Sequence, residues 1–328
     1  MKAKTKKTLI TLSITLIFLV LAGFIGYKGF YDRVYNQSNV EQNLEIGRDT
    51  DKPIETMVKE LAGFPNRFAG TKSNALAGQY IRNYFQESGL SPYFRDSYYH
   101  SFYSDWLKCS RYYIVPVDGM VENVVAVIKG ADSTKAVVIT AHMDSFLGKG
   151  VLDNASGTAV LMETARRLAQ IFPQGTYPVD LVFVAYNAEE CGLVGSRAFY
   201  QVLDQDYTDF YNINMDCVGA AGKPLAFQNL EENSEALYQA FLPILEKHDI
   251  PIKDIAYAAD EDGEPMGTSD HAVFQEDGRA AIVLGESGLL GFTNTRQDKD
   301  LDLLDFPELN RLADAVADFI ETSNGKIY

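Results

Sequence analysis

Four short clusters of acidic and imidazole side chains are spaced along the sequence in a way that suits metal chemistry. They are His142-Met143-Asp144, Asp153-Asn154, Glu189-Glu190 and Asp216. The first, third and fourth each follow an apolar, β-rich run, where a strand is expected to end. In an open α/β sheet, ligands bind beyond the carboxyl ends of the strands, so we expect the clusters to converge on one crevice.

Carboxylates that converge in this way repel one another, and a divalent cation relieves the cost of burying them. One histidine together with several carboxylates suits zinc, which in catalytic sites takes three protein ligands and keeps a position open for water. Asp144, two residues after His142 on an extended chain, is placed to orient the imidazole ring. Each cluster alone is common as a helix cap or a solvated face, and only the four together indicate a metal site.

The clusters need a scaffold, which apolar runs alternating with helix-period segments supply from about Pro53 onward. This alternation predicts a three-layer α/β/α sandwich around a mostly parallel, mixed sheet. Strands are expected at residues 123–128, 136–140, 180–186, 211–215 and 280–284. Helices are expected at residues 156–171, 234–248 and 306–322, the last with Asp305 as its N-cap and Pro307 in its first turn.

Five motifs of the sequence resemble those of a two-zinc exopeptidase family that includes secreted bacterial leucine aminopeptidases, glutamate carboxypeptidases and glutaminyl cyclases. They are AHMDS (141–145), VLDNASGTAVLMETAR (151–166), FVAYNAEECGLVGSRAF (183–199), INMDCVG (213–219) and GTSDH (267–271). The similarity covers about residues 55–320 in order. It implies a zinc-dependent metallopeptidase with a peptide substrate. Among the activities of the family, the resemblance favours an aminopeptidase.

The resemblance also implies a role for each cluster. Asp153 is the implied bridge between two zinc ions, with His142 and Asp216 completing the protein ligands of one ion. Glu190 and a histidine late in the chain are the implied ligands of the other. Glu189 is the implied general base, which deprotonates the attacking water, and Asp144 the residue that holds His142.

The sequence departs from the family at the late histidine, because Asn294 stands where that ligand is expected, within residues 291–298. A neutral amide is a poor zinc ligand, so we expect one tight zinc and a second that is weak or absent. His271 follows Asp270 in a family motif that does not ligate zinc, and three consecutive side chains, Ser269 to His271, cannot form a proton-relay triad. His100 and His248 lie outside any motif and are interpreted as structural.

Two alternatives to the exopeptidase remain open from the sequence. The loss of imidazole at Asn294 favours a catalytically impaired or non-catalytic relative that binds peptides, whereas the retained Glu189 favours an enzyme. An acyltransferase of the glutaminyl cyclase kind is the other alternative.

The N-terminus predicts attachment to the cell membrane. Residues 8–27 carry no charge over 20 residues, the length of a helix that crosses a bilayer. Lysines precede them, so we expect residues 1–7 to be a cytoplasmic tail and the rest to lie outside the cytoplasm. Polar residues 28–50 are interpreted as a stalk and residues 51–328 as the zinc exopeptidase domain. A cleaved signal peptide is the alternative, but the apolar stretch is longer than usual and ends in no Ala-x-Ala site.

Composition excludes other classes of protein. The 328 residues are 46% hydrophobic, which is typical of a packed globular chain and not of a disordered one. With 29 Lys+Arg against 45 Asp+Glu, the net charge of −16 would repel a phosphate backbone, so no nucleic-acid partner is expected. The three cysteines, Cys109, Cys191 and Cys217, cannot all pair within one chain, and the oligomeric state is left open.

Overall fold

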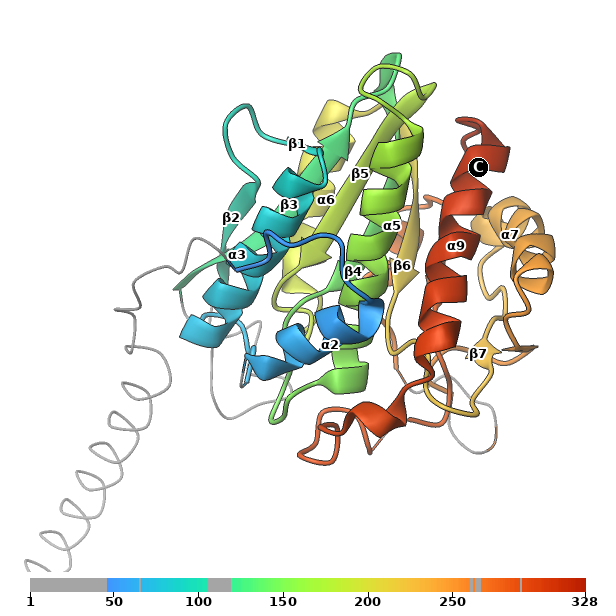
Figure 1. Cartoon of the computed structure of the whole chain (residues 1–328). Helices are drawn as coiled ribbons and strands as arrows, with labels where there is room; N and C mark the ends of the chain where they lie inside the picture. The colour runs from blue at the N-terminus through green and yellow to red at the C-terminus, as the bar shows by residue number, and fades with distance from the viewer. Residues whose placement is uncertain (1–45, 65, 105–118, 260–261, 263–266, 290) are drawn as a thin grey trace, which may run out of the picture. The chain divides into compact units, whose positions relative to one another are not determined.

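The computed structural model describes residues 46–64, 66–104, 119–259, 262, 267–289 and 291–328, and Figure 1 shows their arrangement. The predicted cytoplasmic tail and membrane span, residues 1–27, lie outside the described residues, as does most of the predicted stalk. Within the described ranges, no helix combines the length and the apolar character needed to cross a membrane.

A mixed sheet forms the centre of the described domain. Its strands are β1 (Ser91–Pro92), β2 (Tyr99–Ser104), β3 (Gly119–Ile128), β4 (Asp132–His142), β5 (Val179–Tyr186), β6 (Asp209–Met215) and β9 (Ala281–Leu284). They run in the order β1-β3-β5-β4-β6-β9, and β2 also pairs with β3. The four strands β5, β4, β6 and β9 are parallel to one another, whereas β3 is antiparallel to β5. The mixed α/β fold predicted from the sequence is therefore confirmed.

Helices cover both faces of this sheet. They are α2 (Ile54–Gly63), α3 (Lys72–Glu87), α5 (Gly157–Ile171), α6 (Val194–Asp206), α7 (Glu235–Lys247), α8 (Ala272–Glu276) and α9 (Phe306–Ser323). Short helical turns η1 (Val151–Ser156), η2 (Glu232–Ser234) and η3 (Leu301–Leu303) and a small parallel pair of strands, β7 (Leu225–Ala226) and β8 (Ile252–Lys253), complete the described elements. Figure 1 shows α2, α3, α5 and α9 in front of the sheet and α6 behind it.

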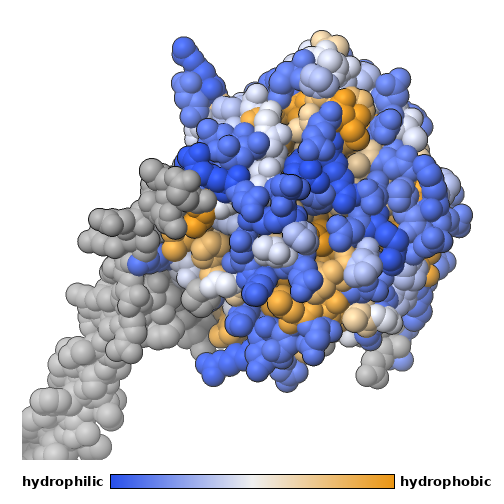
Figure 2. Space-filling view, viewed as in Figure 1, coloured by the Kyte–Doolittle hydropathy of each residue, from blue (hydrophilic) through white to orange (hydrophobic). Residues whose placement is uncertain are grey.

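Two apolar clusters, one on each face, hold the layers together. The larger cluster joins α2, α3, α5, α7 and α9 to one face of the sheet, and the smaller joins α6 and α8 to the other. All eight residues of β5 are buried, because this central strand is covered on both sides, which is why its sequence is almost continuously apolar. Outside the core, the face in Figure 2 is mainly hydrophilic with smaller apolar areas, consistent with the acidic composition.

The predicted helix and strand positions agree with the structure to within a few residues. At α9, the Asp305 side chain accepts a hydrogen bond from Glu308 N at 3.0 Å, as the predicted N-cap requires. The boundary of the predicted stalk is different, because residues 46–50 belong to the folded domain: Asn83 Nδ2 donates to Ile46 O at 2.6 Å. Gly47 permits this, since a Cβ at that position would lie 2.2 Å from Tyr80 O.

Candidate metal centre

Two neighbouring strand ends and a helical turn bring an imidazole and two carboxylates together. β4 lies between β5 and β6 and ends at His142, while Asp216 directly follows β6 and Asp153 lies in η1. His142 Nε2 is 3.1 Å from Asp153 Oδ1 and 3.2 Å from Asp216 Oδ1. One ligand atom from each residue lies within 4.8 Å of the others, and all three side chains are buried.

The electrostatics of these three groups show that they are short of positive charge. Burial alone lowers the pKa of His142, but the charges of Asp216 and Glu189 outweigh it and raise the pKa well above its usual value. Burial raises the pKa of Asp153, whereas at Asp216 the nearby imidazolium outweighs burial and lowers the pKa to about 2.

These three side chains fit a divalent cation. The Nε2 atom of His142 carries at most one proton, yet it faces two carboxylates at hydrogen-bond distance. A cation placed between the three residues would satisfy both carboxylates and the ring nitrogen together. Within the described ranges, this is the one group of three or more His, Cys, Asp or Glu ligand atoms that meets this spacing.

The turn after β5 presents Glu189 and Glu190 beside this group. Asp144 holds the turn, since Oδ1 accepts from Glu189 N at 3.2 Å and Oδ2 accepts from Glu190 N at 3.3 Å. Asp144 Oδ1 also lies 3.5 Å from His142 Nδ1, so one carboxylate contacts both the ring and the turn. Burial and the neighbouring carboxylates raise the pKa of Glu189 and of Glu190 well above their usual value, and a bound cation would lower both again.

Of the implied ligands of a second metal, Glu190 and Asn294 lie outside the three-residue group. Glu190 is buried and its Oε1 atom has no hydrogen-bond partner. Asn294 is half-buried, its backbone has a left-handed φ of 60°, and its Oδ1 atom is likewise buried without a hydrogen-bond partner. Oxygens with unused acceptor capacity are compatible with a weak second site, which stays a prediction.

The other three histidines, His100, His248 and His271, lie outside the three-residue metal group. His100 stacks with Phe94 and Phe102, and His248 Nε2 is 2.9 Å from Asp318 Oδ2. At the start of α8, burial raises the pKa of Asp270 to about 7 and lowers that of His271 to about 4. Near neutral pH, His271 is therefore neutral, whereas Asp270 is divided between its neutral and its charged form.

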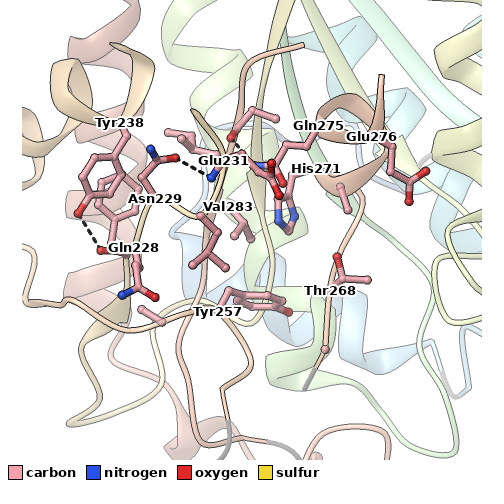
Figure 3. Close-up of a pocket in the computed structure, with 17 residues that line it drawn as sticks. Gln228, Asn229, Glu231, Tyr238, Tyr257, Thr268, His271, Gln275, Glu276 and Val283 are labelled. Atoms are coloured by element: carbon pink, nitrogen blue, oxygen red, sulfur yellow. Dashed lines mark hydrogen bonds between the residues drawn. The ribbon is translucent and has the colours of Figure 1, made fainter. Parts of the chain in front are cut away.

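A cavity of about 340 Å³ lies between β9, α8 and the chain around β7. Figure 3 shows Tyr257 and His271 on its wall with Val283, and the amides of Gln228, Asn229 and Gln275 around it. A hydrogen bond from Tyr257 helps to lower the pKa of Asp216, and the charge of Asp216 opposes the effect of burial on the pKa of His271, so both wall residues interact electrostatically with the metal group. Gly267, Thr268 and His271 of the lining belong to the GTSDH motif, but most of the lining comes from segments without a motif, so the cavity could not be predicted from the sequence.

Two further residues that support the site were missed or undervalued in the sequence. Arg67 is fully buried and donates to the carbonyl oxygens of residues 61, 143, 149 and 150, which fixes the loop after β4. Asp298 accepts from Leu152 N at 2.8 Å and from Asp153 N at 2.9 Å, which places Asp153. No spacing in the sequence marks Arg67, whereas Asp298 was visible as the end of the motif that contains Asn294.

A model of peptidase family M28 matches residues 123–320, which is more than half of the chain and includes all four clusters. The chain belongs to peptidase family M28. The exopeptidase resemblance seen in the sequence motifs is confirmed at the level of the family. Aminopeptidase YwaD of Bacillus subtilis is 31% identical over 150 residues, which are 43% of this chain and 30% of YwaD. The chain spans about a third or less of the length of the curated relatives it matches.

Solved structures share the M28 fold at low sequence identity. A leucine aminopeptidase precursor from Bacteroides thetaiotaomicron superposes with a TM-score of 0.65 at 19% identity, over 85% of this chain and 98% of that one. A glutaminyl cyclase from Fimbriiglobus ruber gives 0.66 at 14% identity, over 86% and 98%. Because one fold accommodates both of these proteins, the choice between their activities depends on the site itself.

Proposed function

We propose that this member of family M28 is a metal-dependent exopeptidase that removes residues from the amino end of peptides. The observation that supports it is the gathering of His142, Asp153 and Asp216 within 4.8 Å, with Glu189 on the adjacent turn. These are the parts that metal-assisted peptide hydrolysis needs: three protein ligands and a nearby carboxylate base.

His142, Asp153 and Asp216 would hold the tight metal, and Glu190 with Asn294 a weaker second one. A divalent metal such as zinc, when bound, acidifies water and polarises a carbonyl group. Glu189 would accept the proton of the attacking water at a carboxylate oxygen and then give it to the leaving amine nitrogen. Asp144 would keep both His142 and the Glu189 turn in position, since it contacts both.

The negative charge of the site would also favour substrates with a free amino end. Burial and the charge of Asp153 raise the pKa of Glu190, so a positively charged α-amine beside them would relieve the repulsion between the two carboxylates. We infer that the cavity of Figure 3 takes the side chain of the terminal residue, because Tyr257 and His271 on its wall interact with Asp216.

The test compares three substrates of the full-length chain with zinc present. Leucine anilide has a free amine, N-acetyl-leucine anilide lacks it, and a peptide that begins with glutamine reports cyclisation by loss of ammonia. We expect leucine anilide to be hydrolysed at least about 100-fold faster than its acetylated form, because the blocked amine loses its charge. Equal rates contradict exopeptidase activity, cyclisation alone indicates an acyltransferase, and no turnover indicates the non-catalytic relative.

We also propose that residues 8–27 anchor the protein in the cell membrane, with residues 1–7 in the cytoplasm and the catalytic domain outside it. The uncharged stretch and the lysines before it support this orientation. Protease added to intact cells should degrade the domain, while a tag on the N-terminus should stay protected. A protected domain contradicts the proposal.

A further inference from the structure

Two buried asparagines, far apart in the sequence, form a reciprocal pair beside the turn that carries Glu189. Asn74 Nδ2 donates to Asn187 Oδ1 at 3.0 Å, and Asn187 Nδ2 donates back to Asn74 Oδ1 at 2.9 Å. Their side chains are 3% and 2% exposed, so water does not compete for these bonds. The two carboxamides therefore hold each other face to face through both of their polar atoms.

The remaining hydrogen bonds of the two asparagines connect two segments of the chain. Asn74, in the first turn of α3, also donates through Nδ2 to Arg67 O at 2.8 Å. Asn187 directly follows β5, and its side chain donates to Glu122 O at 2.9 Å and accepts from Ala188 N at 2.9 Å. The pair thus connects α3 and the Arg67 segment to the first residues of the Glu189 turn.

The backbone of that turn depends on side chains from elsewhere. Asn187 N donates to Asn123 Oδ1 at 2.8 Å, and two residues later the Asp144 carboxylate accepts from the turn. Ala188, between these two anchor points, has a left-handed φ of 58°, a conformation that a non-glycine residue adopts only where its surroundings impose it. The Asn187 side chain accepts a hydrogen bond from Ala188 N at 2.9 Å and so contacts this residue directly.

The amide type matters as well as the position. A carboxamide offers a donor and an acceptor at once, so two of them pair without charge in a region already crowded with carboxylates. Aspartate at either position would place two acceptors opposite one another, and alanine would leave buried polar groups without partners.

We propose that Asn74 and Asn187 are positioning residues for the reaction, which hold the turn so that the Glu189 carboxylate faces the metal group. The inference rests on the proposed function of Glu189 as the base. Misplacement of a reacting group by about 1 Å costs on the order of 100-fold in rate, so loss of the pair should act on kcat.

The test measures kcat, KM and zinc content of the full-length Asn74→Ala and Asn187→Ala variants and of the double variant. We expect kcat to fall about 10- to 100-fold, with KM and zinc content near wild type. Because the pair acts as one unit, the double variant should lose little more than either single variant. Additive losses, or an unchanged kcat, overturn the proposal.

Asn83→Ala is the matched control. Asn83 also lies in α3 and is 2% exposed. Its side chain donates a hydrogen bond to Ile46 O, at the start of the described domain. We expect Asn83→Ala to lower thermal stability while kcat stays within about twofold of wild type, because the lost hydrogen bond joins α3 to residue 46 and not to the site. A similar loss of kcat in this variant would mean that any destabilised α3 reduces the rate, and would overturn the specific role of the pair.

Asn74→Asp provides a readout that a purely structural role would not move. When protonated, the introduced carboxyl group can donate to Asn187 Oδ1 and accept from Asn187 Nδ2, which restores both bonds. The ratio of its kcat to the wild-type kcat should therefore rise as the pH is lowered from about 8 to about 6, because burial favours the protonated form. The same ratio for Asn74→Ala should stay flat, and equal pH dependence of the two variants contradicts the account.

Failure of the inference and failure of the proposed function give different results. If wild type turns over substrate, Glu189→Gln does not, and the Asn74 variants match Asn83→Ala, only the positioning role is wrong. If wild type shows no turnover, the proposed function is wrong, and a crystal structure of Asn74→Ala then decides the pair's role without activity. An unmoved turn at residues 187–190 in that structure would overturn it.

Discussion

The strand β5 has a buried carboxylate near each of its ends, and the two have opposite surroundings. Near its start, Asp180 Oδ2 accepts from Lys129 Nζ at 2.8 Å and from Tyr207 OH at 2.9 Å, while Oδ1 accepts from Gly130 N and Ser133 Oγ. After its end, Glu190 Oε1 has no hydrogen-bond partner, and burial with the charges of Asp153 and Glu189 raises the Glu190 pKa well above its usual value.

The difference separates a carboxylate that the fold satisfies from one that the fold leaves unsatisfied. The fold supplies four donors to Asp180, so its charge is satisfied within the chain. At the other end the fold gathers more negative charge than it neutralises, which creates a requirement for a cation or a cationic substrate group.

The largest effect is expected from the loss of a proposed metal ligand near the carboxyl end of β5, which we call the metal end. Asp216→Asn should weaken zinc binding at least about 100-fold, because changes to residues that only support a ligand already cost about 10–100-fold. Zinc at about 100 times its Kd should stabilise wild type by about 2.7 kcal/mol and the variant much less. Calorimetric titration and thermal unfolding with and without zinc measure both, and equal stabilisation would remove Asp216 from the ligand set.

Removal of charge at the two ends should change stability in opposite directions. Asp180→Ala should lower the free energy of unfolding by about 3 kcal/mol, because it leaves buried donors without partners. Glu190→Gln should leave the metal-free protein as stable or more stable, by up to about 1 kcal/mol, since it removes an unsatisfied charge. Urea denaturation after chelation measures both changes. Equal destabilisation at the two ends would erase the contrast.

Asn294→His tests whether the metal end lacks one ligand. We expect zinc content to rise from about one toward two ions per chain, since imidazole is a better zinc ligand than a neutral amide. Elemental analysis of the purified chain gives the ratio, and Asn324→His, at a distant left-handed C-cap of α9, is the matched control. An unchanged ratio would mean that residue 294 is not the missing ligand position.

A carboxylate in α9 should show an effect on stability that depends on pH. Burial raises the pKa of Glu308 to about 7, from 4.5. The folded state thus binds this proton more tightly, so the stabilising contribution is complete below about pH 4.5 and is lost as the pH rises through about 7. Glu308→Gln should be more stable than wild type at pH 8 by about 1–3 kcal/mol and equal to it near pH 4.5. Denaturation curves at the two pH values decide, and a difference independent of pH contradicts the assignment.

The sequence predicted most of the scaffold because its signals are local. Apolar runs marked the strands, and Asp305 with Pro307 marked the start of α9, since propensity and capping act within a few residues. His142 and Asp216 could be placed together because parallel neighbouring strands end at the same edge.

The support of the site could not be predicted in the same way. Arg67 contacts residues 143, 149 and 150, and Asn74 contacts Asn187, 113 positions later. Such bonds depend on how whole layers pack, and no period or spacing in one sequence encodes which distant polar groups meet. The segment around Gly47 could not be predicted for the same reason. Its polar composition predicted a stalk, whereas Gly47 packs closely against Tyr80 of the folded domain.

The central claim, a metal-dependent peptidase with Glu189 as its base, is tested most directly by zinc content and leucine anilide turnover in wild type and Glu189→Gln. We predict about one tightly held zinc in both proteins, with turnover lowered by about 10²–10⁴-fold in the variant, because the base is lost and the ligands are kept. Wild type that holds no zinc, or a variant that turns over substrate at the wild-type rate, would contradict the account.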